Sequence, residues 1–286
     1  MGHAIVRLCF FGAKLVRVTT ACGLLLALLL ARTLPAAEVV AFPSGDKQLH
    51  GLLYKPPGSG PFPAVLFNHG SASGMLNNQA FELIAPLFTR RGWAFFAPYR
   101  RGQGLSADAG QYIGNEISAA KEKGGLQLGA ETMVRLLTTE QLQDQLAALA
   151  WLRQQPLVRP KQIAAVGNSF GGIESLLGAE QPGYCAVVDA SGGAESWQIA
   201  PELHTVMLDA GAHARVPVLF FQAQNDYTLE PSYVLYDAMH RAGKPAAIRI
   251  YPPYGSSPAE GHSFSWRGAL IWAPDVLEFL AKSCGA

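Results

Sequence analysis

The sequence has little charge and few cysteines. Only 15% of its 286 residues are charged and only four are cysteine, whereas 49% are hydrophobic. Such a composition excludes an intrinsically disordered chain and a disulfide-dense mini-protein. The formal net charge of +1 and the lack of a basic run argue against a dedicated nucleic-acid-binding surface. The length allows one large or two small domains, and no internal repeat divides it.

Acidic residues are absent from residues 1–37, which contain four basic residues, an apolar run over 21–31 and a final Pro35-Ala36-Ala37. This order of features is typical of a secretory signal peptide. An uncleaved N-terminal anchor is the alternative, but the apolar run is shorter than the roughly 20 residues that span a bilayer. We therefore expect an exported protein, periplasmic or extracellular, with no stable membrane insertion after cleavage.

Short apolar runs alternate with segments of helical period through the rest of the chain. Runs such as 63–67 and 217–221 are apolar at every position, which is typical of parallel strands covered on both faces. The alternation predicts an α/β fold, with a doubly wound, mostly parallel sheet flanked by helices. The expected strands are 49–54, 64–68, 94–98, 163–166, 186–189, 218–222 and 248–251. The expected helices are about 78–91, 130–155, 170–180, 230–242 and 265–283.

Two stretches, at about 102–130 and 190–216, do not fit a minimal sheet. Both would leave the carboxyl ends of strands, where α/β proteins bind ligands, and long loops at such places often form binding walls. We expect them to be pocket-forming excursions. No Pro- or Ser-rich linker divides residues 38–286, so a single domain is expected there.

The strongest chemical signal is Gly167-x-Ser169-x-Gly171, which follows a predicted strand and precedes a predicted helix. A sharp strand-to-helix turn exposes a serine hydroxyl, and glycines two positions away on either side relieve the crowding. The helix start also directs free N–H groups toward developing negative charge. An ordinary Gly/Ser turn would match the bare pattern, so its place at the junction is what favours a nucleophile.

A serine nucleophile needs a base, and the base needs a group that orients it. Asp226 follows the strand 218–222, and His262 follows the strand 248–251 and its Pro252-Pro253 loop. Carboxyl ends of parallel strands share one edge of a sheet, so both side chains are expected near Ser169. Asp189, which also ends a strand, is the competing acid, and a surface-loop histidine is the alternative interpretation of His262.

These motifs resemble those of the α/β-hydrolase superfamily, and within it the dienelactone hydrolase-like group of esterases and peptidases. The resemblance covers about residues 49–283 and includes Asn68-His69-Gly70 and the segment 99–106, Tyr-Arg-Arg-Gly-Gln-Gly-Leu-Ser. It implies the order serine, acid, histidine along the chain. It also implies an oxyanion hole formed by the backbone N–H groups of Phe170 and Ser71.

The resemblance implies a serine hydrolase that cleaves small or medium-sized carboxylic esters through an acyl-enzyme, without cofactor or metal, and the N-terminal segment implies that it is exported. A serine peptidase on the same fold is the alternative, and a non-catalytic binding protein that retains the fold is a weaker one. Members closest to dienelactone hydrolase carry a cysteine nucleophile, so Ser169 puts lactone specificity in doubt. The expected partner is a small-molecule ester rather than nucleic acid.

Pocket candidates are His69, Tyr99 and Tyr227. His69 has no second ligand at metal-binding spacing nearby, and Tyr99 could equally be a buried structural residue. Tyr227, Trp197 and Trp266 could line an aromatic pocket, although core packing explains each more simply.

Cys185 and Cys284 would be the two cysteines left after signal cleavage. Cys185 begins a predicted strand and Cys284 ends the last predicted helix, which places both near the amino edge of the sheet. A disulfide between them is feasible, and two separate buried thiols are the alternative.

Overall fold

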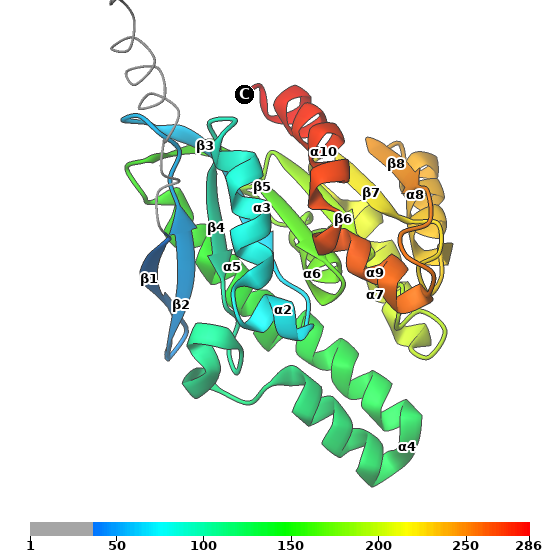
Figure 1. Ribbon diagram of the computed structural model, residues 1–286. Helices are drawn as coiled ribbons and strands as arrows, with labels where there is room; N and C mark the ends of the chain where they lie inside the picture. Colours follow the sequence, from blue (N-terminus) through cyan, green and yellow to red (C-terminus); the bar gives the residue numbers. More distant parts are fainter. Residues whose placement is uncertain (1–36) are drawn as a thin grey trace, which may run out of the picture. The chain divides into compact units, whose positions relative to one another are not determined.

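An eight-stranded β-sheet forms the centre of residues 37–286, the part of the chain that the computed structural model describes (Figure 1). The strand order is β1-β2-β4-β3-β5-β6-β7-β8. The β1-β2 and β2-β4 pairs are antiparallel, and every other neighbouring pair is parallel. The strands are β1 (Glu38–Ser44), β2 (Lys47–Tyr54), β3 (Phe62–Asn68), β4 (Ala94–Pro98), β5 (Val158–Asn168), β6 (Ala186–Ala190), β7 (Val218–Ala223) and β8 (Ala246–Tyr251).

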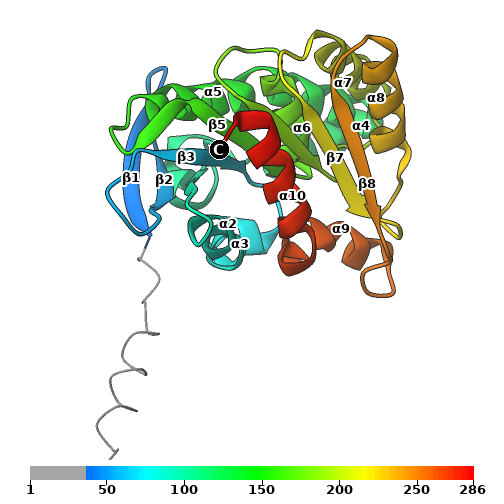
Figure 2. The same ribbon diagram turned by 90° about the horizontal axis from the view of Figure 1, so that it is seen from above.

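Helices cover both faces of this sheet (Figure 2). One face carries α4 (Ile113–Thr138), α5 (Glu140–Arg153), α6 (Phe170–Gly178), α7 (Pro201–His213) and α8 (Glu230–Arg241). The other carries α2 (Ser73–Leu76), α3 (Gln79–Thr89), α9 (Pro258–Arg267) and α10 (Ala269–Cys284). A short 3₁₀ helix, η1 (Gly104–Ala109), follows β4. The predicted doubly wound, mostly parallel sheet flanked by helices is therefore confirmed.

The sheet separates two apolar cores because successive side chains of a strand point to opposite faces. Within β3, Leu66 packs into the core under α4–α8, whereas Val65 and Phe67 pack into the core under α3 and α10. Phe67 stacks on Phe95 of β4 with 5.4 Å between ring centroids. Continuous apolar strands thus supply both cores at once, which is why these runs contain no regular polar alternation.

The structure corrects several predicted element bounds. The strand β1 was not predicted, because it is an edge strand with mostly exposed side chains and contains a proline. The predicted helix 130–155 is broken at Thr139, and the predicted helix 265–283 is broken at Gly268. A Cβ at position 268 would lie 2.2 Å from the Phe264 ring, so only glycine fits the close approach there.

Both predicted excursions are largely helical rather than irregular loops. Residues 102–130 form η1 and the first part of α4, which bends at Gly124 and Gly125 and projects as a helical hairpin (Figure 1). Gly125 has φ +78°, a conformation that suits glycine and lets the second arm reverse direction. Residues 190–216 form a compact turn followed by α7. The length of these two stretches therefore could not show whether they form long loops or helices interrupted by glycine.

A disulfide joins Cys185, directly before β6, to Cys284 at the end of α10, with 5.1 Å between the Cα atoms. The open question of their pairing is thereby answered by the structure. The bond closes a sequence separation of 99 residues and ties the last helix to the amino edge of the sheet.

The predicted signal peptide, residues 1–37, lies outside the described residues except for Ala37. Within residues 37–286, no helix combines the length and the apolar character that crossing a membrane requires.

Candidate active site

Ser169 occupies a sharp turn between β5 and α6, with φ 54° and ψ −122°. The neighbouring glycines make this turn possible. A Cβ at Gly171 would lie 1.8 Å from the carbonyl oxygen of Asn68, and one at Gly167 would lie 2.0 Å from the carbonyl oxygen of Gly171. The glycine–serine pattern is therefore a packing requirement, and the strained turn presents the serine hydroxyl beyond the end of the strand.

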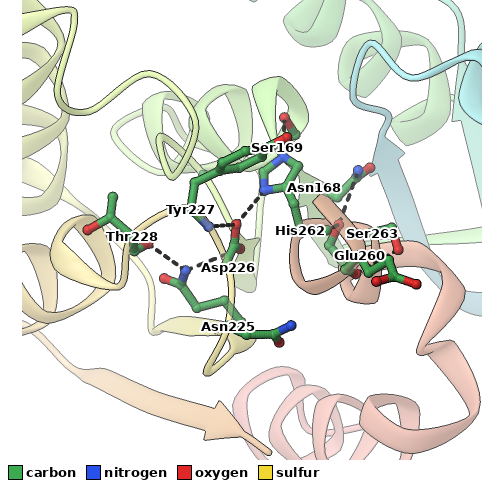
Figure 3. Close-up of polar contacts among 12 residues, drawn as sticks. Asn168, Ser169, Asn225, Asp226, Tyr227, Thr228, Glu260, His262 and Ser263 are labelled. Carbon is green, nitrogen blue, oxygen red and sulfur yellow. Dashed lines mark hydrogen bonds and ion pairs between the residues drawn. The ribbon is translucent and has the colours of Figure 1, made fainter. Parts of the chain in front are cut away.

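The structure brings Ser169, His262 and Asp226 together from three elements that are distant in sequence (Figure 3). Oγ of Ser169 lies 3.0 Å from Nε2 of His262, and Nδ1 of His262 lies 2.8 Å from Oδ1 of Asp226. A carboxylate oxygen accepts hydrogen bonds, so Nδ1 of His262 carries the hydrogen and donates a hydrogen bond to Oδ1 of Asp226. In the neutral ring Nε2 is then free to accept from the serine hydroxyl.

Asp226 is held in place by its own surroundings. Its side chain has no exposed surface, Oδ1 also accepts from the Tyr227 N–H at 2.7 Å, and Oδ2 accepts from Nε2 of Gln222 at 3.2 Å. The His262 side chain remains 15% exposed. The acid is thus buried and oriented, while the base retains access to solvent and substrate.

His262 lies in the second turn of α9 and not in the loop that the sequence suggested. The helix begins with a capping box, in which the Ser257 hydroxyl accepts from the Glu260 N–H and the Glu260 carboxylate accepts from the Ser257 N–H. Asn225 steadies the loop before it, donating to the carbonyl oxygens of Tyr254 and Ser257. A capped helix therefore fixes the imidazole more firmly than a loop would.

Asp189, the competing acid, does not reach His262. Its Oδ1 accepts from the Gly192 N–H at 2.7 Å, and the side chain lies beneath the turn that follows β6. Burial raises the pKa of Asp189 to about 7, and the hydrogen bond from Gly192 opposes this shift. Asp189 therefore stabilises the turn after β6, and Asp226 is the acid beside His262.

This raised pKa makes the stability of the protein depend on pH. The unfolded state ionises Asp189 near its ordinary pKa of 3.8, whereas the folded state holds the proton until about pH 7. The free energy of unfolding should therefore fall as pH rises from about 4 to about 7, by a few kcal/mol from this group. In Asp189→Asn this part of the decline should disappear, as measured by urea unfolding at pH 5 and pH 8. An equal decline in both proteins would contradict the prediction.

The two expected oxyanion donors flank Ser169. Phe170 is the first residue of α6, so its N–H has no carbonyl one turn back within the helix. Ser71 follows β3 and lines the same cavity as Ser169. Its loop is held by the Gly70 N–H, which donates to Oδ1 of Asn168 at 3.0 Å, and by Tyr112, whose hydroxyl donates to the Ser71 carbonyl oxygen at 3.0 Å.

Asn168 was not singled out from the sequence. It is the variable position between Gly167 and Ser169, so the motif itself carries no information about it. In the structure its buried amide connects the nucleophile turn to the loop of Ser71. Arg100, also buried, supports the same loop by donating to the His69 carbonyl oxygen at 2.7 Å.

The expectation that His69 and Tyr99 line the pocket is corrected, because both are fully buried behind it. Nδ1 of His69 donates to the Gly70 carbonyl oxygen at 2.7 Å, and the hydroxyl of Tyr99 donates to Oδ1 of Asn78. Burial and, secondarily, the charge of Arg100 lower the pKa of His69 well below its usual value, so the ring is neutral. Both aromatic rings thus support the loop from within.

Tyr227 is 45% exposed and packs beside His262, with 5.3 Å between ring centroids (Figure 3). Trp197 is buried in the core, in agreement with the core packing considered for it from the sequence. Trp266, in contrast, lines the cavity beside Ser169. Two aromatic side chains therefore lie at the site, Tyr227 beside the imidazole and Trp266 in the wall of the Ser169 cavity.

The cavity at Ser169 has a volume of about 130 Å³. It is lined by Ser71, Ala72, Asn168, Ser169, Glu195, His262, Ser265 and Trp266. Glu195 comes from the excursion 190–216, whereas the excursion 102–130 approaches only through the hydrogen bond of Tyr112. A larger cavity of about 610 Å³, around Trp93 and Arg159, lies away from this site and contains no serine or histidine.

No cluster of His, Cys, Asp or Glu that could hold a metal ion occurs within residues 37–286. The reactive groups of the site are a serine hydroxyl, an imidazole, a buried carboxylate and backbone N–H groups.

The chain matches the model of the dienelactone hydrolase family over residues 49–269. An esterase from Pyrococcus furiosus superposes with a TM-score of 0.63 at 15% identity, covering 87% of this chain and 93% of the esterase. An acylaminoacyl peptidase from Pyrococcus horikoshii gives a TM-score of 0.62 at 20% identity, over 93% of this chain. A puromycin-hydrolysing peptidase from Mycobacterium tuberculosis gives 0.60 at 20% identity, over 88% of this chain.

The chain spans only 44% of the length of the first peptidase and 40% of the second. At these identities, the structural likeness establishes a shared fold. No curated protein matches the chain in sequence.

Proposed function

This chain belongs to the dienelactone hydrolase family, and from that premise we propose that it is a serine hydrolase that cleaves small or medium-sized carboxylic esters through an acyl-enzyme. The observation that carries the proposal is the continuous hydrogen-bonded chain from Ser169 through His262 to Asp226. A serine hydroxyl needs such a base to become a useful nucleophile, and the base needs a buried acid to hold its tautomer.

In the acylation step, Oγ of Ser169 attacks the ester carbonyl carbon while its proton passes to Nε2 of His262. The resulting imidazolium is stabilised by Asp226. The carbonyl oxygen becomes an oxyanion that accepts hydrogen bonds from the N–H groups of Phe170 and Ser71. One such donor typically contributes about 3–4 kcal/mol to transition-state stabilisation.

The tetrahedral intermediate then collapses. The bond to the leaving oxygen breaks, and His262 returns its proton to that oxygen, so the alcohol departs and an acyl-serine remains. Water attacks this ester by the same route, giving its proton to His262. The second collapse releases the carboxylic acid, and the proton returns to Ser169, which completes the cycle without a cofactor.

A serine peptidase is the second candidate, supported by the likeness of the fold to two peptidases. Amide cleavage would use the same groups, since His262 could protonate a leaving nitrogen as it would an oxygen. The small cavity and the exposed imidazole do not by themselves favour a peptide, so the ester remains our first choice.

We also propose that the protein is exported. The basic, apolar and small-residue order of residues 1–37 supports this location, and so does the Cys185–Cys284 disulfide, because disulfides persist in oxidising compartments.

Covalent trapping tests the proposed function. A fluorophosphonate reacts with activated serines, so the intact mass of the folded protein should rise by one phosphonyl group, and peptide mapping should place it on Ser169. Ser169→Ala should remain unlabelled. Ser263→Ala, which removes a hydroxyl one residue from His262 that bonds only its own helix, should label as the unaltered protein does.

Two outcomes would count against the proposal: no labelling of the folded protein, or equal labelling of Ser169→Ala at another residue. p-Nitrophenyl esters are intrinsically more reactive than anilides, so substrate type is tested with blocked peptide p-nitroanilides. An esterase should leave these intact under conditions in which it hydrolyses p-nitrophenyl esters of increasing acyl length. Rapid, Ser169-dependent cleavage of a peptide anilide would favour the peptidase.

A further inference from the structure

We propose that this site prefers substrates with a positively charged ammonium group near the scissile carbonyl, and that Glu195 recognises that group. The proposal rests on the proposed function and adds a substrate class to it. Glu195 is the one carboxylate among the residues lining the Ser169 cavity. The other carboxylate of the site, Asp226, has no exposed side-chain surface and is committed to His262.

The turn that carries Glu195 is held rigidly. It begins with Ser191 and Gly193 in the left-handed region, at φ 61° and φ 80°, and Asp189 secures it through the Gly192 N–H. Its far end is anchored by Trp197, which is buried and stacks on His204 with 3.9 Å between ring centroids. The backbone that carries Glu195 is therefore preorganised, so little backbone entropy is lost when a ligand binds its carboxylate.

Glu195 has no cationic partner within 4.0 Å among residues 37–286, and the side chain is exposed. No Lys or Arg is among the residues lining the Ser169 cavity, and Arg267 belongs to the wall of its neighbour. It lies over the Trp266 ring and lines the adjoining cavity, which also contains Glu260. The Ser169 cavity thus contains one negative side chain whose charge the protein does not neutralise.

Aromatic surface supports the same ligand chemistry. Trp266 of α9 lines the cavity, and Tyr227, in the loop after β7, packs beside the His262 imidazole. Burial raises the pKa of Tyr227, and the charges of Glu195 and Asp226 raise it further, so the field of Glu195 extends across the mouth of the site. Ammonium groups bind favourably against aromatic faces beside a carboxylate.

An unpaired carboxylate beside an oxyanion hole would be unfavourable for a neutral ester. Negative charge develops on the substrate carbonyl oxygen in the transition state, and Glu195 repels that charge. A substrate ammonium group attracts both the carboxylate and the developing oxyanion, so its benefit grows from ground state to transition state. The preference should therefore be visible in kcat/KM.

Two pairs of isosteric esters measure this effect. Acetylcholine is compared with 3,3-dimethylbutyl acetate, and the p-nitrophenyl ester of 4-(trimethylammonio)butanoate with that of 5,5-dimethylhexanoate. Each pair differs by N⁺ in place of carbon, on the alcohol or on the acyl side. In the unaltered protein at low salt, the cationic member of at least one pair should have a kcat/KM about tenfold higher or more.

Glu195→Gln keeps the size of the side chain and should bring the ratio of kcat/KM, cationic over neutral ester, close to one. Glu202→Gln removes another exposed carboxylate, on α7, and should leave this ratio unchanged. Added salt should reduce the ratio in the unaltered protein. A ratio near one for both pairs, or one unchanged in Glu195→Gln, would overturn the cation preference. If the neutral esters are still hydrolysed in a Ser169-dependent manner, only this inference fails. Hydrolysis that is independent of Ser169 would overturn the proposed function itself.

Discussion

Replacing Ser169 with alanine should lower kcat/KM for p-nitrophenyl acetate by about 10⁴-fold or more. The substitution removes the atom that forms the acyl-enzyme and leaves His262 and Asp226 hydrogen-bonded to each other. The oxyanion donors remain, so a small residual rate above the uncatalysed reaction is expected. The measurement is nitrophenolate release at saturating and subsaturating ester, with purified protein.

The fold should survive this change, since among residues 37–286 the hydroxyl is hydrogen-bonded only to Nε2 of His262. The thermal midpoint and the far-UV circular dichroism of the variant should therefore match those of the unaltered protein. Equal rates of nitrophenolate release in the unaltered protein and in folded Ser169→Ala would show that Ser169 is not the nucleophile and that no acyl-enzyme forms on it.

Replacing Asp226 with asparagine should lower kcat by about 10⁴-fold, with a much smaller change in KM. The side chain keeps its shape, but Oδ1 accepts from both Nδ1 of His262 and the Tyr227 N–H, so an –NH₂ group in that position loses the hydrogen bond from Tyr227. An amide also cannot stabilise the imidazolium, and an –NH₂ group facing His262 favours the tautomer in which Nδ1 accepts. Nε2 then carries the proton and no longer accepts from Ser169. Steady-state kinetics at pH 8 would measure the effect.

Asp189→Asn is the matched control for this substitution. It removes a buried carboxylate of the same size from β6, the strand that pairs with β7, and keeps an oxygen for the Gly192 N–H. Its kcat should stay within a few-fold of that of the unaltered protein. A loss as large as that of Asp226→Asn would show that the effect of Asp226→Asn is not specific to the carboxylate beside His262.

Much of the fold could be predicted because its signals are local. Apolar runs such as that in β7 indicated strands buried on both faces, and the glycine–serine pattern required a strand-to-helix junction. The relative positions of Ser169, Asp226 and His262 then followed from the rule that parallel strands end at one edge. The structure places Ser169 and Asp226 each within hydrogen-bonding distance of the His262 imidazole, on opposite ring nitrogens.

Several features escaped prediction because they depend on contacts between distant segments. His69 and Tyr99 follow strands, as pocket residues do, but α3 and neighbouring aromatic rings enclose them. The role of Asn168 depends on the Gly70 N–H, which lies 98 residues away in sequence. The helical position of His262 depends on a capping box that the proline-rich loop before it obscured.

Short-range pattern and chain order by themselves determined the α/β class, the strand-to-helix turn at Ser169 and the order serine, acid, histidine along the chain. Only the tertiary structure decided the pairing of Cys185 with Cys284, the burial of His69 and the entry of Glu195 into the cavity. The physical reason is that hydrophobic period and backbone strain act over a few residues. Burial, charge pairing and cavity shape are set by whichever distant segments pack against them.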